Sequence, residues 1–314
     1  MPKAQEWLNE YLNNNYPHRT RSQTEKITSI NMINQQLEGK LELNLDDFPN
    51  LVELDCSNNR ITEINFVSGV KSSSSKRQKM EWKLKKLNLS NNNFAGQDLS
   101  FLTELTELEE LLIGNNKLIG SLKPLKNMTK LRKLDISNTD IDSGLEYLPN
   151  SLEEICCSAE KEDAKVKIIA ETIDSLFKAV KENKIGEVRE IVEAEKLKNI
   201  NFHDKHGNSL LHYSTQKDNL DLLKLLVGSG VDVKATDKRG WSVLHSAALW
   251  IVSDQGDWNI IEFLLESGAD PDAETDNNLT TRDIFFQKDY SYIEQYDILV
   301  EKIFQQTKIL VKDK

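Results

Sequence analysis

The chain has 314 residues, with 51 Asp and Glu against 40 Lys and Arg and a formal net charge of −11 at pH 7. This length allows two domains, and the acidic balance argues against nucleic-acid binding, which draws on clustered Lys and Arg. No apolar run approaches the roughly 20 residues of a membrane span, and the start lacks a signal peptide's apolar stretch. Three cysteines without a CxxC pattern favour a reducing compartment. We therefore expect a cytoplasmic protein, with a nuclear location left open, that contacts neither membrane nor nucleic acid.

The first predicted element is an amphipathic helix at about residues 3–13. Its apolar residues recur at helical spacing: Ala4, Trp7, Leu8, Tyr11 and Leu12. The helix should end before Pro17. A helix in this position would cover the open end of a stack of repeats.

Six segments between residues 27 and 157 share one apolar frame, which is clearest in LVELDCSNNRI at 51–61. The segments start at 27, 51, 84, 108, 131 and 152. Each predicts a short strand and a return segment that bury their apolar side by stacking, with Leu, Ile and Cys pointing inward. The Asn of the frame, such as Asn59, should hydrogen-bond the backbone of a tight turn. Cys56 and Cys157 occupy inward positions, so we expect both thiols to be buried.

This frame and its CSNN spelling resemble the leucine-rich-repeat family, especially its intracellular fungal and bacterial-type members. The start of the chain, AQEWLNEYL followed by YP, also resembles the N-terminal cap of the fungal proteins. The resemblance implies an α/β solenoid of short parallel strands closed by the N-terminal helix.

The one long step between segments contains KSSSSKRQKM at 71–80, which is polar and has no frame residue. We predict a disordered insertion that loops out of the stack. A nuclear-import signal, phosphorylation at Ser72, Ser73, Ser74 or Ser75, and a patch for an acidic partner all stay open.

Residues between the frame positions of each strand should face a concave surface, in two rows. The first row is Ser29, Glu53, Lys86, Glu110, Lys133 and Glu154; the second is Asn31, Asp55, Asn88, Leu112, Asp135 and Cys156. The alternating charges of the first row could pair with one another and merely hold the sheet. In the functional interpretation this surface docks a protein partner, with Leu112 as its only large apolar member. The candidate residues are Glu53, Asp55, Lys86, Asn88, Glu110, Leu112, Lys133 and Asp135.

The apolar period becomes helical from Ala159 to Asn183, so the first domain should be capped there by a helix. We place the boundary near 160–172, with a leucine-rich-repeat domain at 1–162 and a second domain at 163–314. Because no Gly-rich or Pro-rich linker separates them, the two domains should be fused through helices.

A second period of 33 residues separates Gly207 from Gly240 and His212 from His245, and this is the ankyrin period. The chain has SLLH at 209–212 and SVLH at 242–245 where that family has TPLH, and GVDVKA and GADPDA where it has GADVNA. Residues 175–203 resemble a capping unit. In a last unit, Asn278 stands where Gly207 and Gly240 stand in the units before it. The step from Gly240 to Asn278 is five residues longer than the period, and the extra residues lie near WIVSDQGDW. The resemblance implies a helical stack over about 175–306, with helical caps.

No catalytic motif, metal-ligand pattern or phosphate-binding loop occurs in the sequence, so we expect no enzyme activity, metal or cofactor. In ankyrin repeats the histidines equivalent to His212 and His245 are structural. Partners of that family commonly meet the hairpin tips and inner helices, and Trp and Arg are frequent in binding hot spots. The candidates here are Lys205, His206, Lys238, Arg239, Trp241 and Trp250.

These patterns predict a non-catalytic scaffold or adaptor that binds other proteins and is a monomer. Two alternatives stay open: a regulatory or substrate-recognition subunit of a kinase, phosphatase or ubiquitin ligase, and an enzyme whose site the sequence does not reveal.

Overall fold

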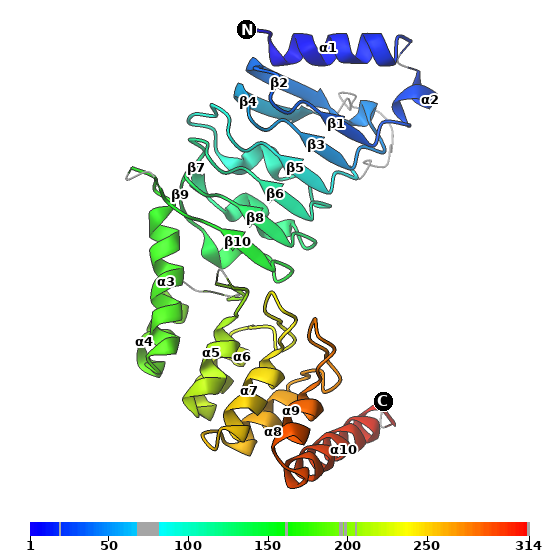
Figure 1. Cartoon of the computed structure of the whole chain (residues 1–314). Coiled ribbons are helices and arrows are strands. Elements are labelled where there is room, and N and C mark those ends of the chain that lie inside the picture. Colours follow the sequence, from blue (N-terminus) through cyan, green and yellow to red (C-terminus); the bar gives the residue numbers. More distant parts are fainter. Residues whose placement is uncertain are drawn as a thin grey trace. The chain divides into compact units, whose positions relative to one another are not determined.

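The computed structural model of the chain describes residues 1–18, 20–67, 82–160, 163–194, 197, 200–204 and 206–312 (Figure 1). The side chains of 21, 290 and 303–312 are outside the description, as are the predicted insertion at 71–80, the serines at 72–75 and Lys205. The chain divides into two compact units, Met1–Thr172 and Ile173–Lys314. The domain limits of 1–162 and 163–314 stay a prediction.

A six-stranded parallel sheet runs through the first unit in the order β1-β3-β5-β6-β8-β10 (Figure 1). Each strand has three residues because each comes from one short repeat. The middle residue of each of the first five strands, such as Leu87 or Leu111, is buried. The strands are β1 Ser29–Asn31, β3 Glu53–Asp55, β5 Lys86–Asn88, β6 Glu110–Leu112, β8 Lys133–Asp135 and β10 Glu154–Cys156.

The return segments form two-stranded parallel sheets and short 3-10 turns. One pair joins β2 Glu38–Asn44 to β4 Arg60–Val67, and the other joins β7 Ile119–Ser121 to β9 Asp140–Ser143. Helix α1 Ala4–Asn15 packs against β2 and buries Ala4, Leu8 and Leu12, and α2 Arg21–Thr24 follows it. The N-terminal helix thus covers the open edge of the first repeat, as its apolar stripe predicts.

The frame asparagines form a hydrogen-bonded ladder between repeats. The Asn116 amide nitrogen donates to the carbonyl oxygens of Leu89 at 2.9 Å and Ile113 at 3.0 Å, while its oxygen accepts from the Asn92 N–H at 3.1 Å. In the first five segments the residue before the Asn position of the frame has a positive φ, for example 58° at Asn58. Asparagine tolerates this left-handed conformation, so the NN pairs combine a turn former with a turn stabiliser.

Two expectations at the end of the first unit are wrong. Helix α3 spans Lys167–Lys181 and does not begin near Ala159. The segment before it still completes the last repeat, because the Glu160 N–H donates to Asn138 Oδ1 at 2.7 Å and the Val166 N–H donates to the Thr139 carbonyl at 3.2 Å. Cys157 is also only half-buried, since it follows the edge strand β10.

The second unit consists of helices joined by turns and three antiparallel bridges, which link His203 to Ser209, Thr236 to Ser242 and Glu274 to Thr280. Its remaining helices are α4 Ile185–Ala194, α5 Leu210–Ser214, α6 Leu220–Gly228, α7 Val243–Val252, α8 Trp258–Glu266, α9 Thr281–Lys288 and α10 Tyr290–Lys312 (Figure 1). The turns need a left-handed residue, which Gly207, Gly240 and Asn278 supply with φ of 85°, 75° and 57°. The predicted α/β unit followed by a helical stack is therefore confirmed.

The five extra residues lengthen α7 and the loop that follows it. Trp258, at the start of α8, stacks on Phe285 with ring centroids 5.0 Å apart and lies 6.0 Å from the Tyr292 ring. Trp258 is therefore part of the packing between α8, α9 and α10, while Trp250 on α7 is half-buried.

Candidate functional site

The predicted concave rows of the first unit lie in register across the sheet. Strand pairing places Glu53 beside Lys86, Lys86 beside Glu110, and Glu110 beside Lys133. The same pairing aligns the second row, which is Asn31, Asp55, Asn88, Leu112, Asp135 and Cys156. The sheet therefore brings together all eight candidate residues of the first unit.

Charges of opposite sign pair along the first row. Lys86 lies 3.9 Å from Glu110, and Lys133 lies 3.4 Å from Glu154, whose charge raises the pKa of Lys133. These ion pairs are partly exposed, so they add little stability. They offset both lysine charges of the row, so the row has little free positive charge to attract an acidic partner.

A parallel row, which the sequence analysis overlooked, precedes the strands. Lys85 pairs with Glu109 at 2.7 Å, and Arg132 pairs with Glu153 at 2.7 Å. The sequence does indicate this row through doublets of like charge, such as KK at 85–86 and EE at 109–110. The charge of the doublet alternates between positive and negative from the third repeat to the sixth.

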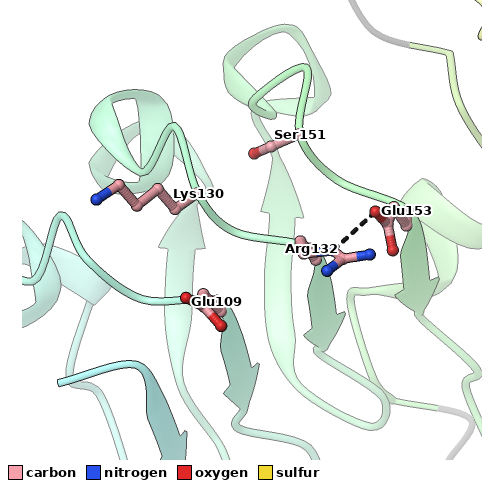
Figure 2. Close-up of a pocket in the computed structure, with 5 residues that line it drawn as sticks. All are labelled: Glu109, Lys130, Arg132, Ser151 and Glu153. Atoms are coloured by element: carbon pink, nitrogen blue, oxygen red, sulfur yellow. Dashed lines mark hydrogen bonds and ion pairs between the residues drawn. The ribbon is translucent and has the colours of Figure 1, made fainter. Parts of the chain in front are cut away.

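This second set of ion pairs lines an open pocket of about 360 Å³, formed by Glu109, Lys130, Arg132, Ser151 and Glu153 (Figure 2). Lys130 pairs with Glu107 at 2.6 Å, and Ser151 donates to the Leu131 carbonyl at 2.8 Å. Because its cations are engaged by neighbouring carboxylates and its hydroxyl by the backbone, the pocket has structural groups and no poised nucleophile or base.

Most polar members of the second concave row are turned toward the backbone. Asp55 Oδ1 accepts the Ser57 N–H at 2.8 Å, and Asp135 Oδ1 accepts the Ser137 N–H at 2.9 Å. Asn88 makes the equivalent bond to Ser90 at 3.1 Å and also donates to Asp55 Oδ2 at 2.9 Å. Such bonds stabilise the turn after each strand.

Leu112 interrupts this pattern because its side chain has no acceptor. It is half-buried between Asn88 and Asp135 on the same face. The face therefore presents one apolar side chain among polar groups, several of which are already hydrogen-bonded or ion-paired within the sheet. This environment suits a partner that contributes an apolar residue and hydrogen bonds.

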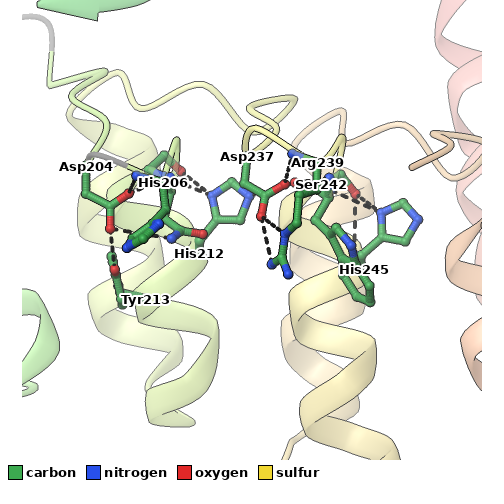
Figure 3. A network of polar contacts seen from close by, with 11 residues as sticks. Asp204, His206, His212, Tyr213, Asp237, Arg239, Ser242 and His245 are labelled. Carbon is green, nitrogen blue, oxygen red and sulfur yellow. Dashed lines mark hydrogen bonds and ion pairs between the residues drawn. The ribbon is translucent and has the colours of Figure 1, made fainter. Parts of the chain in front are cut away.

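In the second unit, the turns before α5 and α7 are built alike. The carboxylates of Asp204 and Asp237 point into the turns and accept backbone N–H groups (Figure 3). The side chains of His206, Lys238 and Arg239 are exposed. The Lys238 N–H donates to the His206 carbonyl at 3.1 Å, so the two turns lie side by side. Of the candidate residues here, only Lys205 is outside the described part of the chain.

Trp241 has both a structural and an exposed aspect. Its N–H donates to Asp237 Oδ1 at 3.0 Å and its carbonyl accepts from His212 Nε2 at 3.0 Å. The half-exposed ring lies 5.6 Å from the His245 ring and 5.9 Å from the Arg239 guanidinium carbon. The backbone of Trp241 thus fixes the turn, while its ring and Arg239 border the surface.

His212 and His245 connect successive repeats. The Nδ1 of each accepts the N–H of Ser209 or Ser242 at 3.1 Å, and Nε2 of His245 donates to the Leu279 carbonyl at 2.9 Å. Donation from Nε2 and acceptance at Nδ1 require the neutral ring. Burial, which disfavours the charged form, lowers the pKa of both histidines. The arrangement is a capping and stacking device and leaves no free base.

This geometry makes the second unit sensitive to acid. Unfolded histidine has a pKa of about 6.5, and the folded values are lower, so the unfolded chain binds more protons below that pH. The stability that the two neutral histidines contribute is complete above the pKa of unfolded histidine, and it is lost as the pH falls toward their pKa values in the folded protein. We expect peptides from α5 and α7 to lose hydrogen-exchange protection between about pH 7.5 and 5.5, after correction for intrinsic rates. The first unit, whose only histidine is the exposed His18, serves as the internal control. Equal losses in both units would contradict the assignment.

Within the described ranges no cluster of three or more His, Cys, Asp or Glu could hold a metal ion. None of the described helices combines the length and apolarity needed to cross a bilayer. No catalytic family is among those that match the chain.

Comparison with known proteins gives two family matches. A model described as ankyrin repeats, in three copies, matches residues 176–275, and a leucine-rich-repeat model matches 50–69 and 83–105. The repeats predicted from the sequence are thus confirmed in both parts of the chain.

Three similar proteins illustrate the relationship. Notch-regulated ankyrin repeat-containing protein A of Danio rerio is 44% identical over 50 residues, which are 16% of this chain and 45% of that protein. Protein phosphatase 1 regulatory subunit 27 of Mus musculus is 31% identical over 98 residues, 31% of this chain and 60% of that protein. Ankyrin repeat and SOCS box protein 3 of Bos taurus is 29% identical over 109 residues, 34% of this chain and 19% of that protein. Each alignment spans less than two thirds of the relative.

Proposed function

Because this chain joins leucine-rich repeats to ankyrin repeats, both of which are protein-interaction modules, we propose that it is a non-catalytic adaptor with one binding face on each unit. On the first unit the face is the pair of concave rows, centred on Leu112. On the second unit it is formed by the turns that carry His206, Lys238, Arg239 and Trp241, with Trp250 on α7. The observation that carries the proposal is that each unit has its own ordered array of exposed and half-exposed side chains.

Rigid presentation would be the binding mechanism. Backbone hydrogen bonds already order the side chains of Asp55, Asn88 and Asp135, and the two basic turns are fixed by their own aspartates. An ordered surface loses little conformational entropy when it binds, so a modest number of contacts yields useful affinity. The three cysteines, none of them in a disulfide, are in keeping with a monomer acting in the cytoplasm or nucleus.

A second candidate function is a regulatory or substrate-recognition subunit of an enzyme. It is favoured by the similarity to a protein named as a protein phosphatase 1 regulatory subunit, subunit 27 of Mus musculus. In that case one enzyme would be the main partner, and binding would change its activity.

The two candidates can be separated by capture with full-length baits that differ at one face. We expect Leu112→Asn to abolish capture of partners of the first unit and Trp241→Ala to weaken capture by the second. Leu112→Asn should change the free energy of unfolding by less than about 1 kcal/mol, because the new amide can accept the Gly114 N–H as Asn88 does from Ser90. Matched controls are Ile168→Asn and Phe286→Ala, which alter exposed apolar side chains that belong to neither face.

Mass spectrometry of the retained proteins distinguishes the outcomes. Two partner sets, each lost with a different variant, support the adaptor. A single enzyme lost with either variant supports the regulatory subunit. If both variants retain the same proteins as the wild type, the two faces are not the binding surfaces and the proposal is wrong.

A further inference from the structure

The turns of the second unit separate their charges by direction. Asp204 and Asp237 point inward, and the Asp237 side chain is only 3% exposed. His206 and Lys238 are exposed, and Arg239, which pairs with Asp237 Oδ2 at 3.0 Å, keeps 76% of its side chain exposed. Burial alone would raise the pKa of Asp237, but the N–H groups of Arg239 and Trp241 and the Arg239 guanidinium outweigh it and lower the pKa. The carboxylates are therefore charged but turned away from the surface.

Asp204 is engaged in the same way. Its Oδ1 accepts the N–H groups of His206 and Asn208 at 2.8 and 2.9 Å, and its Oδ2 accepts the hydroxyl of Tyr213 at 2.5 Å (Figure 3). Burial, together with the adjacent carboxylate, raises the pKa of Tyr213 to about 12, so the tyrosine stays a hydrogen-bond donor. The carboxylate of each turn is thus engaged in hydrogen bonds within its own repeat.

The outward side has cations and aromatic rings. Lys181, at the end of α3, lies over the Tyr213 ring with Nζ 4.2 Å from its centroid, and Arg239 borders Trp241. Among the described residues, Lys181, His206 and Lys238 form no ion pair with a carboxylate. We call Lys181, His206, Lys238 and Arg239 the basic face. It ends at the third turn, where Asp276 follows and its N–H donates to the Arg239 carbonyl.

This basic face contrasts with the rest of its unit. Residues 173–314 contain 25 Asp and Glu against 18 Lys and Arg, and no Lys or Arg occurs between Gly240 and Arg282. The unit as a whole therefore repels a long polyanion, while a few exposed cations attract a short one locally. Nucleic acid and anionic membrane surfaces fit poorly, because both need many phosphate contacts at once.

We infer that the basic face binds a short, extended, acidic segment of a protein partner. Carboxylates of the segment would pair with Lys238 and Arg239 on one turn and approach His206 on the neighbouring turn. An apolar residue of the segment would pack on the half-exposed Trp241 ring, and Lys181 would complete the charge complement beside Tyr213. The inference rests on the proposed function, since it specifies the partner chemistry of the second unit's binding face.

The test is a selection of short random peptides on the full-length protein, followed by fluorescence anisotropy with the most enriched peptide. We expect enrichment of Asp and Glu with at least one large apolar residue. The double variant Lys238→Glu with Arg239→Glu should weaken binding of the selected peptide by about tenfold or more. Added salt should weaken binding of the same peptide to the wild-type protein. The matched control is Lys224→Glu with Lys234→Glu, which makes the same charge change at exposed bases outside the face.

The single variant Lys238→Glu controls for misfolding of the double variant, because the Lys238 side chain is exposed and makes no ion pair in the described structure. It should still weaken binding severalfold. Selection of neutral or basic peptides, no enrichment, equal loss in the control, or tighter binding to single-stranded DNA or phosphatidylserine vesicles would each overturn the inference. The adaptor proposal fails separately, through the capture experiment with Leu112→Asn and Trp241→Ala.

Discussion

Replacing Asn92 with alanine should lower the free energy of unfolding of the first unit by about 3 kcal/mol. Asn92 is 7% exposed, and its amide connects neighbouring repeats. The nitrogen donates to the carbonyls of Cys56 and Leu89 at 2.9 and 3.0 Å, and the oxygen accepts the Ile61 N–H at 3.0 Å. Alanine leaves the buried Ile61 N–H without this acceptor, removes a donor from each carbonyl and creates a cavity.

Native-state hydrogen exchange in peptides from β3, β5 and β6 would measure this loss separately from the second unit. The adjacent Asn93→Ala is the matched control, because Asn93 is exposed and only its backbone bonds to the neighbouring repeat, through the Ile61 carbonyl. Similar losses for both variants would show that the buried ladder is not the main source of the effect.

The variant His245→Asn should destabilise the second unit by about 3 kcal/mol. His245 is fully buried, and it joins three features: the start of α7 through Ser242, the next repeat through the Leu279 carbonyl, and the ring of Trp241. Asparagine can still accept the Ser242 N–H, but it is too short to reach Leu279. The expected loss therefore comes mainly from the bond between repeats and from the cavity left by the ring.

Thermal unfolding with peptide-resolved exchange from α7 to α9 would measure the effect. His206→Asn makes the same chemical change at an exposed turn position and should leave the stability within about 0.5 kcal/mol. His245→Asn should also make the second unit less sensitive to acid. If stability were retained, the bond to Leu279 would be dispensable and the structural role assigned to His245 would be wrong.

The sequence predicted the concave rows of the first unit, because the frame residues fix the register between neighbouring strands. Once Leu54, Leu87 and Leu111 point inward on neighbouring parallel strands, the residues on either side of each must align. Recurring spacing also identifies the second unit. Its turn residues are Gly207 and Gly240, and a histidine follows each of them five residues later.

Other features depended on contacts that repeat spacing does not encode. The helical period from Ala159 appeared continuous, yet the N–H groups of Glu160 and Val166 bond to Asn138 and Thr139 of the preceding repeat. Cys157 matched an inward frame position but follows an edge strand. The ion-paired pocket at Glu109 and Arg132 was visible in the sequence only as doublets of like charge.

The sequence by itself determined the repeat classes, the inward residues, the register of the rows and the candidate binding residues, because these depend on spacing that recurs in every repeat. Only the tertiary structure decided which charges are available. Along the first unit, Lys and Glu of neighbouring strands neutralise each other, whereas in the second unit Asp204 and Asp237 turn inward and leave Lys238 and His206 exposed. Charge availability depends on which partner each side chain meets in space, and that is a property of the folded chain.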